Sequence, residues 1–342
     1  MSDSQSVPRP PRAALRRFSY PLAWSSAGLV GGLGLVAFAS WAFTPNLEDS
    51  NGSNSFATTL PPNPSSSTPT NDSTPAAVPL VWPETIQQGD HAKRLLLAIL
   101  EEVERRLQSY PGHRAQFKRL ERIHGQLGPW QTIELKVLHN PLSVYMKFLE
   151  PDDGKEVLYS QGRFDNHLIA HPGGMARLLT PRLKLDPNGP LAMAENRHPI
   201  TSAGLLNLVR RLIHFRRLDL NHPTSHLRLD RIETPDGQMV FRSCHRHLKR
   251  TDQHPYSRSE IWYDSATCLP IRVENHDWPA GIILGHTISS PADLGDPFAI
   301  FDAPDNGETL VEIYEYAHLD FETPLTPLDF DPANPAYGFR RF

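Results

Sequence analysis

The feature that most constrains the fold of this chain is a succession of short runs in which apolar and polar residues alternate. Gly, Pro, Asn and Asp separate the runs, and such regular spacing with short breaks predicts an antiparallel meander. The first runs span 115–123, 132–139, 143–149, 156–160 and 167–171. Similar runs follow at 225–233, 238–248, 256–264, 268–278 and 310–320. A sheet of this many strands must curl or close on itself, so we expect strong curvature.

Two segments have helical periodicity instead. Between Ala92 and Leu107 apolar residues recur every three or four positions, and Thr85 and Gln88 before them have capping-box spacing. A second helix is expected over 201–218, with Thr201 as its N-cap. This order of elements predicts an α+β domain at 84–342: a curved antiparallel sheet, open like a half-barrel and covered by two main helices.

The N-terminal region predicts a membrane anchor. Arginines in the segment 1–21 precede the uncharged run 22–43, whose helical length of about 33 Å is enough to cross a bilayer core. No Lys or Arg follows the run before Lys93, so the positive-inside rule places 1–21 in the cytoplasm. We therefore expect a single-pass signal-anchor in the inner (cytoplasmic) membrane, with the C-terminal domain on the periplasmic, extracytoplasmic side.

The segment 44–83 consists largely of Ser, Thr, Pro and Asn. It has too little apolar surface to offset the entropy of ordering, so we expect a disordered linker. Such a tether suits a retained anchor better than the alternative of a cleaved signal peptide, for which the residues ending at Ala42 are only a fair cleavage site.

Composition and cysteine spacing narrow the classes of function. A net charge of −4 and a pI near 6.5 give no electrostatic reason to expect nucleic acid as a partner.

Cys244 and Cys268 fall about two strand spacings apart, each of about 4.8 Å. That separation exceeds the roughly 7 Å limit for a disulfide, so we expect both cysteines to be unbridged.

Catalytic and metal-binding motifs are missing from the sequence. There is no nucleophile elbow, phosphate-binding glycine loop, CxxC pair or HExxH, so we predict no catalytic residue and no cofactor. His245 and His247 would share one face of a strand, with His254 and His276 within plausible reach. No Cys or carboxylate lies beside these histidines at zinc-like spacing, so we also predict no metal site.

One hairpin is apolar beyond what a single buried face requires. "VYMKFLEPDDGKEVLYS", 144–160, predicts two strands about the turn Pro151–Gly154. We expect Phe148 opposite Val157 and Met146 opposite Tyr159, which makes one face wholly apolar and leaves the other amphipathic. The apolar face therefore meets either packed helices or a space for a ligand.

Several stretches resemble known families. "FKRLERIHGQL", "VYMKFLEPDDGKEVLYSQG", "HPITSAGLLNLV" and "YEYAHLDFETPLTPLDFDPANPAYGF" resemble an uncharacterised bacterial family, domain of unknown function 1571, over roughly 94–339. More distantly, the hairpin region is similar to the strand–turn–strand core of the LolA-like lipoprotein carrier superfamily. That resemblance implies an open barrel lidded by helices, a hydrophobic cavity for acyl chains, and a carrier or sensor that is not an enzyme.

These observations predict a membrane-tethered exported domain that binds a lipid or lipoprotein acyl chain, in cell-envelope handling or sensing. The expected cavity wall consists of Val144, Met146, Phe148, Val157, Tyr159, Leu205, Leu208 and Leu212. One alternative is a cell-envelope interaction or structural protein without a small ligand, which would expose an apolar patch and have no cavity. A third is a hydrolase, in which His, Asp and Ser would meet in a cleft.

Overall fold

The computed structural model describes residues 81–174, 182–280, 285 and 307–339. Every described residue belongs to one compact unit, Asp72–Phe342. The predicted anchor 22–43 and nearly all of the predicted linker lie outside the described residues. Within the described part, no helix is both long and apolar enough to span a membrane.

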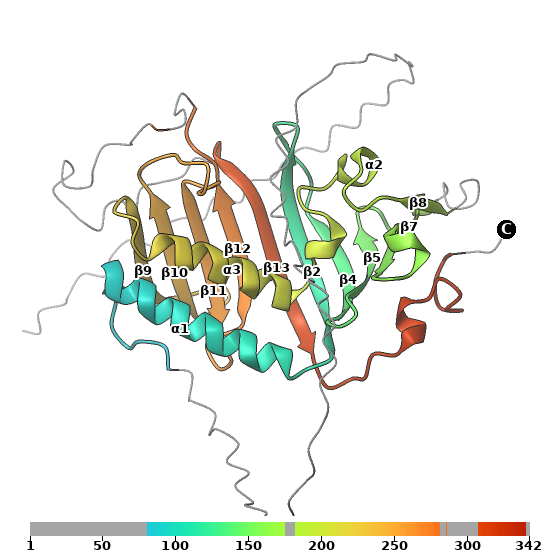
Figure 1. Ribbon diagram of the computed structural model, residues 1–342, viewed down its shortest axis with the longest axis horizontal. Helices are drawn as coiled ribbons and strands as arrows, with labels where there is room; N and C mark the ends of the chain where they lie inside the picture. Colours follow the sequence, from blue (N-terminus) through green and yellow to red (C-terminus); the bar gives the residue numbers. More distant parts are fainter. Residues whose placement is uncertain (1–80, 175–181, 281–284, 286–306, 340–342) are drawn as a thin grey trace, which may run out of the picture. The chain divides into compact units, whose positions relative to one another are not determined.

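The described unit is built on one sheet of 13 strands (Figure 1). The strand order is β1-β9-β10-β11-β12-β13-β2-β4-β5-β6-β7-β8, with β3 paired only to β2. The strands are β1 Gln87–Gln88, β2 Gly112–Ile123, β3 Gln126–Leu127, β4 Gln131–Leu138, β5 Ser143–Glu150, β6 Glu156–Ser160, β7 Leu168–His171, β8 Leu183–Leu185, β9 Ser225–Glu233, β10 Met239–His247, β11 Arg258–Asp264, β12 Pro270–His276 and β13 Leu310–Asp320. Because β1 and β8 end the order without pairing to each other, the sheet is open.

Two meanders make up this sheet, and all their strand pairs are antiparallel. The pairing of β13 with β2, from Glu312↔Glu121 to Asp320↔Arg114, joins one meander to the other. Every run predicted from alternation is a strand, and β9 and β13 have the predicted bounds. The sequence missed β1, β3 and β8, because alternation cannot be recognised over two or three residues.

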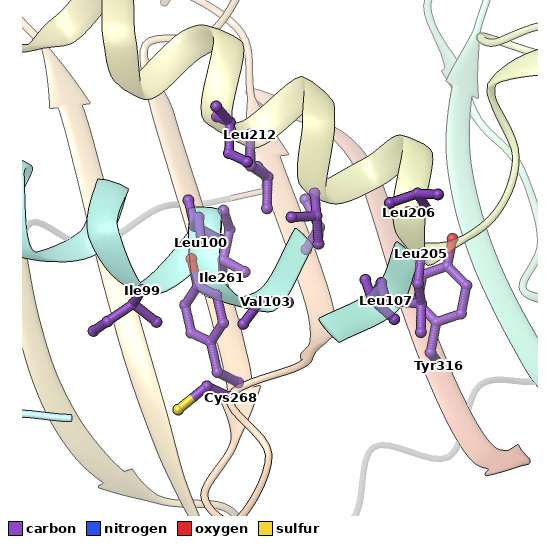
Figure 2. Packing of buried hydrophobic residues seen from close by; sticks show 14 of the residues in the cluster. Ile99, Leu100, Val103, Leu107, Leu205, Leu206, Leu212, Ile261, Cys268 and Tyr316 are labelled. Atoms are coloured by element: carbon purple, nitrogen blue, oxygen red, sulfur yellow. The ribbon is translucent and has the colours of Figure 1, made fainter. Parts of the chain in front are cut away.

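Two long helices, α1 (Gly89–Gln108) and α3 (Leu205–Asp219), lie together across one face of the β9–β13 half (Figure 1). Figure 2 shows their apolar side chains packed with those of the strands; among the residues of this core are Ile99, Leu100, Val103, Leu107, Leu205, Leu212, Ile261 and Tyr316. Each fully buried aliphatic side chain of this kind contributes about 1.5–3 kcal/mol. The predicted covering of one sheet face by two helices is confirmed. The shorter elements are α2 Pro190–Met193, η1 Phe164–Asn166, η3 Ile200–Ser202 and η5 Pro327–Phe330.

Both predicted helix caps are wrong. The N-cap of α1 is Gln88 and it makes no side-chain capping bond, while the Thr85 hydroxyl accepts a hydrogen bond from Gln87 instead. Helix α3 begins at Leu205 rather than near Thr201, which lies in η3. The cause is Gly204, whose φ of 96° interrupts the helical backbone between the two segments.

The 144–160 hairpin forms, but its register differs from the prediction. Val144 pairs with Tyr159 and Met146 with Val157, because the turn is longer than expected and Phe148 bonds to Lys155. Since the shift is even, each side chain stays on its predicted face.

The C-terminal segment covers the amphipathic face of this hairpin. Tyr145 stacks on Tyr337 with ring centroids 3.9 Å apart, and Leu158, Phe330 and Phe339 complete the cluster. Glu156, buried beneath this segment, accepts a 2.7 Å hydrogen bond from the Gly338 N–H. The amphipathic face is thus an interior surface.

Two further details concern the ends of the domain and its cysteines. Trp82, in the predicted linker, is 2% exposed and stacks on Phe241, so the folded body begins before residue 84. Cys244 and Cys268 are both buried and free, which confirms the predicted absence of a disulfide.

Gly204 offers a test of the junction between η3 and α3. A Cβ at this position would lie 2.9 Å from Val137 Cγ1, and its φ is one that other residues rarely adopt. We expect Gly204→Ala to lower the free energy of unfolding by about 1–3 kcal/mol or more, measured by urea denaturation. Gly128→Ala is the control: a Cβ there would meet only the Glu121 carbonyl at 3.4 Å, so we expect a change within about 0.5 kcal/mol. Equal midpoints for the two variants would contradict this account.

Candidate ligand-binding site

A partly enclosed cavity of about 120 Å³ lies between the sheet and the segment that joins β8 to α3. Strands of both meanders contribute to it, since β2, β5, β6, β7 and β13 all supply lining residues. The apolar lining consists of Phe117, Met146, Phe148, Val157, Leu168, Pro187, Ala192, Pro199, Ile200, Ala203, Leu208 and Tyr316. The apolar face of the hairpin therefore meets a space as well as packed helices.

The structure divides the predicted wall residues into two groups. The residues that line the cavity are Met146, Phe148, Val157 and Leu208. The others are packed against protein; these are Val144, Tyr159, Leu205 and Leu212. On α3 the three leucines share one face, because they are three and four residues apart, and Leu208 is the half-buried one that meets the space.

Sequence reasoning missed several wall residues. Phe117 and Tyr316 were placed correctly on strands, but only the pairing of β13 with β2 brings them to the same cavity. Ile200 comes from η3, and Ala192 comes from α2, two short elements that periodicity did not detect. One signal could have found Phe117 and Tyr316. Each occupies one of the alternating positions whose side chains lie on a single face of its predicted strand.

Polar side chains form one end of the cavity. Arg119 lies 3.4 Å from Glu121 and donates a 2.6 Å hydrogen bond to the side-chain oxygen of Asn196. Arg211 Nη1 lies 3.3 Å from His198 Nδ1. Within the described part of the chain, no carboxylate forms an ion pair with Arg211. The cavity thus combines an apolar wall with a cationic group whose charge no direct ion pair offsets.

Beneath this polar end lies the buried carboxylate of Glu312, whose side chain is 2% exposed. It accepts hydrogen bonds from His198 (2.9 Å), Arg197 (3.1 Å), Tyr256 (2.8 Å) and Asn275 (2.7 Å). Burial alone would raise the pKa of Glu312, but His198 and the other hydrogen-bond donors outweigh it and hold the pKa well below its usual value. Glu312 therefore stays charged and fixes His198 next to Arg211.

A second and larger depression, of about 750 Å³, adjoins the cavity. Turn residues form much of it, including Pro151, Asp152 and Gly173. Glu121 and Lys155 border both spaces. We take the smaller space as the candidate site because its lining is the more apolar and enclosed, and the larger one as its open approach.

The predicted hydrolase arrangement is met only in part. Ser225 Oγ lies 2.5 Å from His245 Nε2 and 3.1 Å from Asp219 Oδ1. Serine and aspartate therefore meet the same ring nitrogen, whereas a catalytic triad needs them on opposite nitrogens. All three side chains are buried, and neither of the two spaces described above reaches them. This trio cannot act as a nucleophile with its base.

Comparison with known proteins identifies the family. Residues 110–339 match the family described as proteins of unknown function, DUF1571. The chain belongs to the DUF1571 family. The match covers most of the described unit, including the cavity, and confirms the family predicted from the sequence. No curated protein matches this DUF1571 chain.

Solved structures similar to this DUF1571 protein include three with names that refer to lipoproteins or to LolA. A putative outer membrane lipoprotein-sorting protein domain from Vibrio parahaemolyticus is 14% identical, with 69% of this chain and 95% of that chain covered and a TM-score of 0.32. A LolA superfamily protein from Nitrosomonas europaea is 12% identical, with 68% and 96% covered and a TM-score of 0.27. The lipoprotein LppX from Mycobacterium tuberculosis is 10% identical, with 69% and 98% covered and a TM-score of 0.34.

Glu312 gives a test with a defined pH dependence. We expect Glu312→Gln to lower the free energy of unfolding at neutral pH by about 1.5–3 kcal/mol, the contribution of a hydrogen bond to a charged group. Because the pKa of Glu312 is lower in the folded than in the unfolded state, its stabilisation is present above the usual glutamate value of about 4.3 and is lost as the pH falls below it. The difference between wild type and variant should therefore shrink in acid.

The measurement is urea denaturation across a pH series, with Glu322→Gln, an exposed position, as the control. A difference between Glu312→Gln and wild type that stays constant from neutral pH into the acid range would contradict the assignment.

Proposed function

We propose that this DUF1571 protein binds an acyl chain of a lipid or lipoprotein in the cavity between β5–β6 and α3. The observation that carries the proposal is an apolar cavity, polar at one end, that the protein's own side chains leave unfilled. Protein interiors are normally packed without such voids. Because the cavity is only partly enclosed, water can enter it, and an acyl chain that displaces this water from the apolar wall would gain free energy.

The dimensions define the kind of ligand. A cavity of about 120 Å³ is smaller than the several hundred Å³ typical of sites that enclose a whole drug-sized molecule. It therefore suits a segment of one acyl chain, and the adjoining depression of about 750 Å³ would hold the remainder. The sequence resemblance to the LolA-like carriers implies the same class of ligand.

The cationic end of the cavity adds a preference for charge. Arg211 lies at the polar end without a carboxylate partner among the described residues, whereas Arg119 and Lys155 pair with Glu121 and Glu195. A bound carboxylate or phosphate would complete the hydrogen bonding of this guanidinium. We therefore propose an anionic amphiphile as the ligand.

The predicted anchor and linker complete the proposal. A retained helix at 22–43 would hold the domain at the extracytoplasmic face of the inner membrane. A flexible linker of the predicted length, 44–83, has an end-to-end distance on the order of 35 Å. The cavity would then stay within reach of the membrane, which fits local handling or sensing of lipids better than transport between membranes.

Filling the cavity tests the ligand directly. We expect Met146→Trp to displace the acyl chain and weaken its binding at least about tenfold, a loss of about 1.4 kcal/mol, and so to reduce the lipid-bound fraction. Native mass spectrometry of the full chain, released gently from membranes, measures that fraction. Met239→Trp is the matched control, because Met239 is 50% exposed and lies outside the cavity lining.

Both variants should retain the thermal transition of the wild type to within a few degrees. A wild-type protein that carries no lipid, or equal occupancy in the two tryptophan variants, would contradict acyl binding at this cavity.

Arg211 tests the preference for charge. We expect Arg211→Met to weaken binding of a fluorescent fatty acid about tenfold or more, since a hydrogen bond to a charged group contributes about 1.5–3 kcal/mol. Binding of the matching fatty alcohol should change little. Arg217→Met is the control on the same helix, because Arg217 is 61% exposed and pairs with Glu101. Equal losses for acid and alcohol would show that Arg211 shapes the cavity without selecting charge.

A further inference from the structure

A buried cluster of Asp219, His247 and His254 lies outside the cavity described above. Asp219 is the last residue of α3, His247 the last residue of β10, and His254 belongs to the connection between β10 and β11. One potential ligand atom from each residue lies within 4.8 Å of the others. The side chains are 0%, 6% and 1% exposed. Tertiary structure thus places a carboxylate beside two of the histidines that the sequence had singled out.

The ring nitrogens converge on one carboxylate oxygen. His247 Nε2 is 2.8 Å and His254 Nε2 is 3.1 Å from Asp219 Oδ1. Two ligands held about 2.0–2.1 Å from a tetrahedral ion lie about 3.3 Å apart. The observed distances are shorter than that spacing by about half an ångström or less, so rotations of the side chains would make room for an ion.

The outer nitrogens of both rings are held in the manner of metal-binding histidines. His247 Nδ1 lies 3.0 Å from the carbonyl oxygen of Tyr256, and His254 Nδ1 lies 2.7 Å from Thr251 Oγ1. A histidine ligand usually donates its other N–H to such an acceptor, which fixes the ring and leaves the inner nitrogen free to coordinate.

The hydrogen-bond donors of the two rings do not match the acceptors around them. The Tyr256 carbonyl and the Asp219 carboxylate are both acceptors, and a neutral imidazole has one N–H, so His247 alone cannot satisfy both. His254 Nε2, although buried, has no hydrogen-bond partner of acceptable geometry in the described part of the chain. A metal ion that accepts both Nε2 lone pairs and Oδ1 resolves both conflicts at once.

The neighbouring His245 has a different role. Its Nδ1 faces the Arg216 guanidinium, which can only donate, so the proton of His245 is on Nε2. That N–H donates to Ser225 Oγ at 2.5 Å, and the Ser225 hydroxyl in turn donates to Asp219 Oδ1 at 3.1 Å. Asp219 Oδ2 lies 3.2 Å from His245 Nε2 and 3.3 Å from Arg216 Nε. Ser225 therefore holds the carboxylate through Oδ1, and this is also the oxygen that His247 and His254 approach.

We propose that Asp219, His247 and His254 bind a transition-metal ion of the Zn²⁺ class. Two imidazole nitrogens and one carboxylate oxygen favour Zn²⁺, Co²⁺ or Ni²⁺ over Ca²⁺ or Mg²⁺, which prefer several oxygen ligands. Because the site is buried and joins the end of α3 to β10 and the following loop, the ion's role is structural. It would stabilise the end of the sheet away from the lipid cavity.

The experiment uses the full chain, purified in mild detergent without a polyhistidine tag. Metal content is measured by inductively coupled plasma mass spectrometry. The chelator-treated protein is then titrated with Co²⁺. We expect about one equivalent of metal in the wild type, visible d–d absorption bands on adding Co²⁺, and a lower melting temperature after chelation.

Variants distinguish this cluster from other histidines. Asp219→Asn and His254→Gln should abolish the Co²⁺ bands. Thr251→Val keeps all three ligands and should weaken metal affinity about 10–100-fold, as expected for loss of an outer partner. His276→Gln is the control. His276 is buried and its Nε2 lies 2.9 Å from Glu274 Oε1, but this pair includes no second histidine.

A wild-type chain that takes up neither Zn²⁺ nor Co²⁺ would overturn the proposal, whether or not the variants fold. Uptake that is equal in wild type, Thr251→Val and His254→Gln would overturn it as well.

Discussion

The pairing of β13 with β2 is the contact on which the rest of the structure depends. It joins two meanders that are each local in sequence into one open sheet, across almost the whole length of the folded unit. Both parts of the candidate site lie on this seam, because Phe117 and Tyr316 form apolar wall while Glu121 and Tyr314 form the polar end. The site therefore exists only when the last strand has been placed.

The polar end of the cavity holds two charged groups in different surroundings, the buried Glu312 and the half-buried Arg211. Glu312 accepts hydrogen bonds from several surrounding side chains and so holds His198 in place beside Arg211. Arg211 itself lacks a carboxylate partner among the described residues, in a region where most arginines have one. Because this half-buried guanidinium lines the cavity, an anionic group from a ligand is its natural complement.

The histidine cluster shows why spacing rules failed to reveal a potential metal site. His245 and His247 were singled out because they alternate on a strand, but their carboxylate neighbour, Asp219, ends a helix far earlier in the chain. His254 reaches the cluster from a connection rather than from a regular element. Short metal-binding motifs place ligands within one turn or one strand, whereas this arrangement draws on three elements.

Local pattern by itself determined the strands, the two long helices, the faces of the hairpin and the separation of Cys244 from Cys268. These follow from alternation, periodicity and turn residues, which act over a few positions. Only the tertiary structure decided the order of strands, the start of α3 at Gly204, and which of Val144, Met146 and Leu208 meet a space. The reason is physical. The position of a residue in the alternating pattern of a strand fixes the face on which its side chain lies. Whether that face is filled depends on segments distant in sequence that pack against it.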